Sequence, residues 1–326
     1  MENNPHEYDV IVLGAGPAGL TAGVYLARAK KRTLILNEGT VGGQLVLTHE
    51  IANYPGVESI SGYQLAATMK KQALMFGCTI RSNVAVTKLD LGGTVKTVEV
   101  NGKETFSAPA VILAMGWRPR MLGAPGEEKF KGKGISYCAT CDGDFFQDKN
   151  IIVVGGGNSA LEEAVSLTKY ARTVTIVHQF DHFQAFAHAI EEARQNPKIS
   201  FIMESTVADF MGNESLERVK IQNLVSGEIV EREIDGVFIF VGYVPNTEKF
   251  VGKIHLSSAG EVVANSSLET NVPGVFAAGD SIQKRYRQVT TAVADGTVAA
   301  LTAIDYLHRQ RANRQEQPEA LEYLSK

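Results

Sequence analysis

The sequence contains few cysteines, no excess of positive charge and no long hydrophobic run. Three cysteines in 326 residues are too few for a structural disulfide framework. The 32 basic and 36 acidic residues leave a net charge of −4, which argues against electrostatic binding of nucleic acid or an anionic membrane. The longest apolar stretches, such as residues 237–244, have the length of a strand, whereas a membrane span needs roughly 18 residues. The polar start shows no signal peptide, so we expect a cytoplasmic protein.

Glycine, by contrast, is abundant and concentrated in two clusters that share one design. The length is sufficient for about two domains. In each cluster an apolar run precedes a glycine-rich turn, which is followed by a helical pattern and a second apolar run. The two clusters begin at Gly14 and Gly155. This repetition predicts two nucleotide-binding βαβ units in one chain.

The first turn follows the apolar residues 10–13 and consists of Gly14, Ala15, Gly16, Pro17, Ala18 and Gly19. Its glycines allow a tight turn and a close backbone approach to a pyrophosphate, which the N-terminus of the following helix attracts. The second apolar run, residues 33–36, leads to Glu38, whose carboxylate can accept a hydrogen bond from a ribose hydroxyl. The alternative is a packing turn without a ligand.

The second turn follows residues 151–154 and predicts another dinucleotide site at Gly155, Gly157, Asn158, Ser159 and Ala160. A site for the 2′-phosphate of NADPH usually supplies arginine after the next strand. Here that position holds His178, Gln179 and Phe180, and no Arg or Lys occurs between Arg172 and Arg194. His178 and His182 have the spacing of metal ligands, but no third ligand is evident, so we predict no metal site and consider a solvated loop as the alternative.

We expect an α/β fold with two Rossmann-like nucleotide-binding domains (three-layer ββα), the second inserted into the first. The first domain is predicted to be discontinuous, with residues 1–117 and 247–326 flanking an inserted domain at 118–246. The reason is that Gly279 and Asp280 follow an apolar run and have the pattern of a cofactor-contact turn. The last helix is predicted at about 289–306, followed by a polar tail from residue 309.

Cys138 and Cys141 form a C-x-x-C pair, the chemical centre of the sequence. Two thiols at this spacing can form a reversible disulfide, and a zinc site would need a second pair that Cys78 alone cannot supply. The carboxylate of Asp142 can move protons as thiols and disulfide interconvert. We expect Cys78 to be buried and structural.

Taken together, these residues resemble the low-molecular-weight thioredoxin reductase family of pyridine nucleotide–disulfide oxidoreductases. The resemblance extends over nearly the whole chain. Its motifs are residues 14–19, 42–45, 51–56, 138–143, 155–160 and 242–246, together with Gly279, Asp280, Arg287 and Gln288.

The resemblance implies FAD in the first domain, a homodimer, and a swivelling inserted domain that carries the redox-active pair. Cys141 would face the flavin, Cys138 would attack the disulfide of a thioredoxin-like protein, and Asp142 would be the acid/base. The residues it implies around FAD, beside the first turn and Glu38, are Gly43, Gln44, Leu45, Asn53, Ala114, Gly116, Gly279, Asp280, Arg287, Gln288 and Val289.

The chain departs from this family in the second nucleotide site. NADPH-using members carry His-Arg-Arg-x-x-x-Arg, and this sequence has His178, Gln179, Phe180 and Gln184 instead. The resemblance therefore points to relatives that receive electrons from reduced ferredoxin, or to relatives that hold a second flavin in the vacated nucleotide site. Phe180 could stack on the ring of such a flavin. The occupant of that site, whether second flavin, NAD(P)H or nothing, stays open. The two alternative functions are a reductase that uses NADH or NADPH, and a flavoprotein redox sensor that does not turn over.

Overall fold

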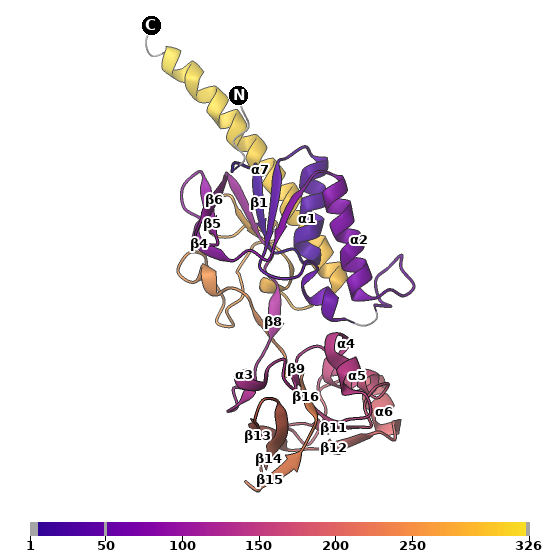
Figure 1. Cartoon of the computed structure of the whole chain (residues 1–326). Helices are drawn as coiled ribbons and strands as arrows, with labels where there is room; N and C mark the ends of the chain where they lie inside the picture. Colours follow the sequence, from indigo (N-terminus) through magenta and orange to yellow (C-terminus); the bar gives the residue numbers. More distant parts are fainter. Residues whose placement is uncertain (1–5, 49–50, 324–326) are drawn as a thin grey trace. The chain divides into compact units, whose positions relative to one another are not determined.

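The computed structural model describes residues 6–48 and 51–323, with only the backbone described for residues 140 and 313–323. The chain divides into two compact units (Figure 1). Unit 1 combines Met1–Arg118 with Pro245–Lys326, and unit 2 is Pro119–Val244. The chain passes between the units at β8 (Trp117–Pro119) and β17 (Tyr243–Pro245), which form a two-stranded sheet.

Unit 1 is built on a five-stranded parallel sheet in the order β18-β7-β1-β2-β3. Helices lie on one face of this sheet, and a three-stranded antiparallel sheet lies on the opposite side (Figure 1). The parallel strands are β1 (Val10–Leu13), β2 (Thr33–Asn37), β3 (Thr79–Ser82), β7 (Ala110–Leu113) and β18 (Val275–Ala277). The antiparallel strands are β4 (Val86–Asp90), β5 (Lys96–Val100) and β6 (Glu104–Ala108), and the helices are α1 (Pro17–Arg28), α2 (Gly62–Met75) and α7 (Val289–Tyr323). Short 3₁₀ turns occur at η1 (Gly43–Leu47), η3 (Glu248–Phe250) and η4 (Gly279–Ser281).

Unit 2 repeats the same plan with a parallel sheet in the order β12-β11-β10-β16-β9. Its parallel strands are β9 (Ile135–Ser136), β10 (Asn150–Val154), β11 (Thr173–Val177), β12 (Ile199–Ile202) and β16 (Gly236–Ile239). The antiparallel sheet consists of β13 (Ser205–Gly212), β14 (Leu216–Asn223) and β15 (Ile229–Glu233). The helices are α3 (Glu127–Phe130), α4 (Ala139–Asp142), η2 (Gly143–Phe146), α5 (Asn158–Leu167) and α6 (Ala187–Gln195). The two Rossmann-like folds predicted from the sequence are therefore confirmed.

The unbroken apolar run of residues 151–154 in β10 reflects burial on both faces of its sheet. Ile151 and Val153 pack into a core with α5 and α6, whereas Ile152 and Val154 pack into a second core with the antiparallel sheet. Successive side chains of a strand point to opposite faces, so a strand covered on both sides has no polar alternation. This burial brings the glycine turn that follows β10 to the carboxyl edge of the sheet.

The prediction that the last helix ends near residue 306 is wrong, because α7 continues to Tyr323. The apolar periodicity stops near Leu307, but the following residues are mostly Arg, Gln, Glu and Ala, which have high helix propensity. No helix among the described residues has the length and apolar character needed to cross a bilayer.

Candidate active site

The first glycine turn has the backbone geometry of a phosphate cradle. Gly14 has φ +103°, and a Cβ there would lie 2.2 Å from the Ala114 carbonyl oxygen. A Cβ at Gly19 would lie 1.9 Å from the Gly14 oxygen, so α1 can approach β1 only through glycine. A Cβ at Gly16, the N-cap of α1, would meet nothing within 4 Å. The N-terminus of α1 is thus open where a pyrophosphate would bind.

A cavity of about 520 Å³ opens at the carboxyl ends of these strands. It brings together four residues predicted for the cofactor, namely Gly14, Glu38, Gly43 and Gln44. The sequence analysis missed other lining residues: Asn37, Gly39, Thr40, Val46, Leu47, Met115, Trp117, Arg118, Asn246, Glu248 and Lys249. Most of these come from distant segments with no nucleotide-binding motif.

Glu38 is positioned by two contacts within unit 1. Its Oε1 accepts a hydrogen bond of 2.9 Å from the Val86 backbone N–H and pairs with the ammonium of Lys249. The neighbouring Asn37 accepts a 2.9 Å hydrogen bond from the Ala15 N–H, which ties the end of β2 to the glycine turn. These contacts hold the carboxylate at the cavity, where it could accept a hydrogen bond from a ribose hydroxyl.

The second group of predicted cofactor residues gathers around η4 and the start of α7. Asn53 Nδ2 and Gln288 Oε1 lie 3.5 Å apart although 235 positions separate them. The guanidinium of Arg287 lies 4.0 Å from the centre of the Trp117 ring, donates to the Asp280 carbonyl at 3.4 Å and pairs with Glu261. Cation–π contact and ion pair together fix the orientation of this arginine.

Three buried polar atoms of unit 1 have no hydrogen-bond partner among the described residues. They are Trp117 Nε1, Ser281 Oγ and Asp280 Oδ1, although the last lies 3.3 Å from the Lys284 ammonium as an ion pair. An unpaired buried polar atom in a native fold costs free energy and needs a partner that the protein alone does not provide. Trp117 lines the cavity, so this buried donor lies next to the space that a bound molecule would occupy.

Cys138 and Cys141 are joined by a disulfide at the short helix α4, with their Cα atoms 5.3 Å apart. Cys138 is the N-cap residue of α4, is only 7% exposed, and its Sγ accepts a 3.0 Å hydrogen bond from the Cys141 N–H. The Cys138 N–H in turn donates to Ser136 Oγ at 3.0 Å. Cys141 is exposed, and Asp142 follows it at the end of α4 with partial exposure. Within unit 2, Cys141 is therefore the accessible half of the disulfide.

Cys78 is buried, as predicted, and takes no part in this site. Its thiol donates to the Gly23 carbonyl at 3.1 Å. Burial raises the pKa of this thiol to about 11, so it stays protonated and unreactive at neutral pH.

A cavity of about 450 Å³ lies at the second glycine turn. Of the residues predicted there, Gly155, Gly157, His178 and Gln179 line it, joined by Gln184, whereas Asn158, Ser159, Ala160 and Phe180 are not among its lining residues. Residues 178–186 fold back over the turn: the Gln184 N–H donates to Gly156 O at 2.8 Å, and the Phe186 N–H donates to Asn158 Oδ1 at 2.7 Å. The turn and residues 178–186 together form one wall of this cavity.

The side chains at this cavity carry little positive charge. His178 is 4% exposed and packs against Phe183, so the solvated loop considered for it is wrong, whereas His182 is exposed. Burial lowers the pKa of His178, which favours the neutral ring. Arg120 is the only Arg or Lys among the described lining residues, and the sequence analysis missed it because it precedes the turn by 35 positions. Among the described residues, no group of three or more His, Cys, Asp or Glu is placed to hold a metal ion.

Unit 2 also holds a buried carboxyl group that the sequence analysis missed. Glu163 lies on α5, and its Oε2 is buried with no hydrogen-bond partner among the described residues. Burial, with a smaller effect of the charge of Glu162, raises its pKa to about 7. Tyr243 lies within electrostatic reach, and its pKa is raised by burial and by the Glu163 charge. Ala139 of α4 belongs to the same core cluster as Ala160 and Ala164 of α5, so this carboxyl lies on the helix that packs with the disulfide helix.

The family model described as pyridine nucleotide-disulphide oxidoreductase matches residues 8–296, and the chain belongs to this family. It is a flavoprotein disulfide oxidoreductase. Its relatives narrow the class further. A thioredoxin reductase of Peptoclostridium acidaminophilum is 46% identical over 314 residues, covering 94% of this chain and 98% of the relative.

Two solved structures of thioredoxin reductases are similar to this chain over most of its length. The thioredoxin reductase of Lactococcus lactis in its FR conformation is 39% identical, with a TM-score of 0.87 and coverage of 93% of this chain and 99% of that one. The ferredoxin-flavin thioredoxin reductase of Clostridium acetobutylicum is 30% identical, with a TM-score of 0.51 and coverage of 93% and 99%. The chain is thus similar to thioredoxin reductases over nearly its full length.

Proposed function

We propose that this chain reduces the disulfide of a small thioredoxin-like protein through Cys138 and Cys141, with FAD as cofactor and a donor other than NADPH. The observation that carries the reductase assignment is the Cys138–Cys141 disulfide, with Cys141 exposed at α4, in a chain whose unit 1 has a nucleotide-type cradle at its glycine turn. The names of the relatives support thioredoxin as the acceptor. Homodimerisation is part of the same proposal and rests on the family resemblance.

The residues of unit 1 fit FAD. The turn at Gly14, the open N-terminus of α1 and Glu38 would hold pyrophosphate and ribose, and the unpaired Trp117 Nε1 and Asp280 Oδ1 would find partners on the cofactor. When bound, FAD supplies a two-electron carrier that can exchange electrons with a disulfide.

The reduced Cys138/Cys141 dithiol transfers its two electrons to the partner disulfide by two thiol–disulfide exchanges. The Cys138 thiolate attacks one sulfur of the partner disulfide, forming a mixed disulfide and releasing one partner thiolate, which takes a proton. The Cys141 thiolate then attacks Cys138 Sγ, restoring the Cys138–Cys141 disulfide and releasing the second partner thiolate. Asp142 next to Cys141 would hold the proton for the leaving thiolate. Because Cys138 is buried in the oxidised state, α4 must open for its attack.

The donor proposal rests on the wall of the second cavity. Gln179 and Gln184 line it at positions where NADPH-using relatives have arginine, and His178 favours the neutral form. A glutamine can offer hydrogen bonds to a 2′-phosphate but no charge. The similarity to a ferredoxin-flavin thioredoxin reductase supports reduced ferredoxin as donor.

Anaerobic mixing of the oxidised holoenzyme with either donor tests this proposal. We expect slow or no loss of flavin absorbance with micromolar NADPH and rapid loss with reduced ferredoxin, followed by reduction of thioredoxin. Rapid and complete bleaching by micromolar NADPH would contradict the donor assignment. The flavin content per chain identifies the occupant of the second site, since two flavins indicate a second flavin there. Failure to reduce a thioredoxin disulfide with any donor would favour a redox sensor.

A further inference from the structure

The backbone of Cys138 is held at its N–H and at its carbonyl by one buried side chain, that of Ser136. Ser136 is the last residue of β9 and is 4% exposed. Its Oγ accepts a 3.0 Å hydrogen bond from the Cys138 N–H and donates one of 3.2 Å to the Cys138 carbonyl. A hydroxyl can do both at once, because it has one donor and two acceptor lone pairs. Since β9 pairs with β16, these bonds tie Cys138 to the parallel sheet of unit 2.

Tyr137, which directly precedes Cys138, is fixed by a buried carboxylate. Its hydroxyl donates a 2.6 Å hydrogen bond to Oε1 of Glu127, a residue that is 1% exposed. Burial, with a smaller effect of this hydrogen bond, raises the pKa of Tyr137, so the phenol keeps its proton and remains a donor. Glu127 also accepts hydrogen bonds from the backbone N–H groups of Leu122 at 3.0 Å and Gly123 at 2.7 Å. These three donors stabilise a carboxylate that would be costly to bury alone.

The carboxylate is anchored in turn by the short helix α3, on which it lies. Phe130 of the same helix is buried in a core cluster with Phe210 of β13, in the antiparallel sheet. We call Ser136, Tyr137 and Glu127 the Cys138 clamp. The clamp thus connects Cys138 to both sheets of unit 2.

The hydrogen bonds of the Cys141 half lead back to Cys138. The Cys141 N–H donates to Cys138 Sγ at 3.0 Å, and the Asp142 N–H donates to the Cys138 carbonyl at 3.2 Å. Ala139 and Gly143 at the two ends of α4 are buried, whereas Cys141 between them is exposed. The part of α4 that can open without disturbing the core is therefore the stretch 140–142.

We propose that the Cys138 clamp keeps Cys138 in place while α4 opens, so that Cys141 is the half of the pair that moves. The three clamp residues are then positioning residues for the attack of Cys138. The inference rests on the proposed function, in which Cys138 attacks the disulfide of a thioredoxin-like protein. Reaction between two protein-bound groups needs a narrow range of distance and orientation, so a fixed thiol reacts faster than a mobile one. A small alkylating reagent can approach freely and depends little on this placement.

Amide hydrogen exchange of the wild-type holoenzyme tests which half moves. The oxidised protein is compared with protein reduced anaerobically by dithiothreitol. On reduction, we expect exchange of the Cys141 and Asp142 N–H groups to accelerate by about tenfold or more, and that of Cys138 to change by less than about twofold. An equal acceleration at Cys138, or none at Cys141 and Asp142, would overturn the proposal. This comparison needs no variant and no electron donor.

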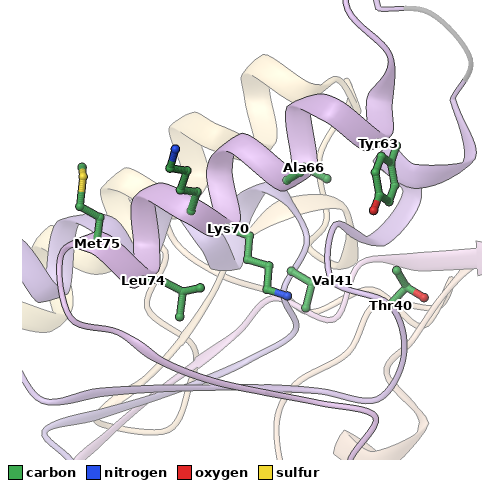
Figure 2. Close-up of a pocket in the computed structure, with 9 residues that line it drawn as sticks. Thr40, Val41, Tyr63, Ala66, Lys70, Leu74 and Met75 are labelled. Carbon is green, nitrogen blue, oxygen red and sulfur yellow. The ribbon is translucent and has the colours of Figure 1, made fainter.

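A kinetic test measures the placement of the thiol in the Cys141→Ser variant, where the mixed disulfide of Cys138 with thioredoxin should accumulate. Adding Tyr137→Phe should slow adduct formation at saturating thioredoxin by about three- to tenfold, and leave alkylation of Cys138 by iodoacetamide within about twofold. The matched control is Tyr63→Phe, which removes the same hydroxyl from an exposed side chain of α2 in unit 1. Figure 2 shows Tyr63 among the residues that line a cavity of about 550 Å³ in that unit. The control should change neither rate.

The outcomes separate this inference from the proposed function. If the wild-type holoenzyme reduces thioredoxin with no donor, the proposed function fails and the positioning role fails with it, while hydrogen exchange still decides which half of the pair moves. If thioredoxin is reduced and Tyr137→Phe leaves adduct formation unchanged, the positioning role is overturned and the proposed function stands. Equal slowing of adduct formation and alkylation also overturns it, because the variant then changes the reactivity of the thiol and not its placement. An equal loss in Tyr63→Phe overturns it as well.

Discussion

At the scale of single residues, Glu163 makes the stability of unit 2 depend on pH. Its pKa rises from 4.5 to about 7 on burial, so the folded state keeps a proton that the unfolded chain releases. The free energy of unfolding therefore falls as pH rises from about 4.5 through 7, by on the order of 2–3 kcal/mol. Glu163→Gln should remove this loss, so its unfolding midpoint should exceed that of the wild type at pH 8 and approach it at pH 5.

The measurement is calorimetric unfolding at both pH values. The exposed Glu228 of the same unit provides the control, and Glu228→Gln should leave the pH dependence unchanged. An unchanged pH dependence in Glu163→Gln would show that the carboxyl has a partner in solution.

The two cysteines should differ when each is replaced. In the Cys141→Ser variant, the remaining Cys138 thiolate is expected to trap thioredoxin as a stable mixed disulfide, because the resolving thiol is missing. In Cys138→Ser, Cys141 remains and no such adduct should accumulate, while titration in denaturant should find two thiols against one, Cys78, in the oxidised wild type. Gel analysis without reductant detects the adduct. An adduct formed only by Cys138→Ser would reverse the two roles.

At the scale of elements, the glycine turn of unit 2 and the segment 178–186 form one packed structure. A Cβ at Gly156 would lie 2.4 Å from the His178 ring, whereas one at Gly157 would meet only Gln184 O at 3.9 Å. Gly156→Ala should therefore destabilise unit 2 by about 1–3 kcal/mol through overpacking, and Gly157→Ala by clearly less. Denaturant unfolding of both variants compares them directly. Equal effects would mean that the segment moves aside at little cost.

This contact illustrates what sequence patterns can and cannot reveal about the elements. The apolar runs at residues 10–13 and 151–154 predicted strands because parallel strands are buried on both faces. The motif likewise identified Gly155 and Gly157 from their spacing. Gly156 has no motif role, and its constraint comes from a side chain 22 positions away. Trp117, Lys249 and Arg120 were missed for the same reason, since each reaches its cavity only through the tertiary fold.

At the scale of the whole molecule, two nucleotide-type cavities share one chain, and their walls carry different charged groups. In the cavity of unit 1, Arg118 pairs with Glu248 and Lys249 pairs with Glu38, whereas the described lining residues of the cavity in unit 2 include Arg120 as the only Arg or Lys and no Asp or Glu. The same βαβ device can therefore serve different ligands in the two units. Selectivity then depends on the few side chains that follow the second strand.

This dependence predicts that NADPH binding can be restored. Gln179 and Gln184 both line the cavity of unit 2, so Gln179→Arg/Gln184→Arg should place two guanidinium groups where a 2′-phosphate would lie. Each charge-assisted hydrogen bond contributes about 1.5–3 kcal/mol, which for two additive contacts corresponds to roughly two to four decades of affinity. Calorimetric titration should show this gain for NADPH and little change for NADH, which lacks the phosphate. Gln147→Arg/Gln195→Arg is the matched control: it makes the same two substitutions at exposed positions of unit 2 outside the described lining of the cavity, and should gain little. A gain of equal size from this control, or none from Gln179→Arg/Gln184→Arg, would mean that the segment 178–186 does not present its side chains to NADPH in this arrangement.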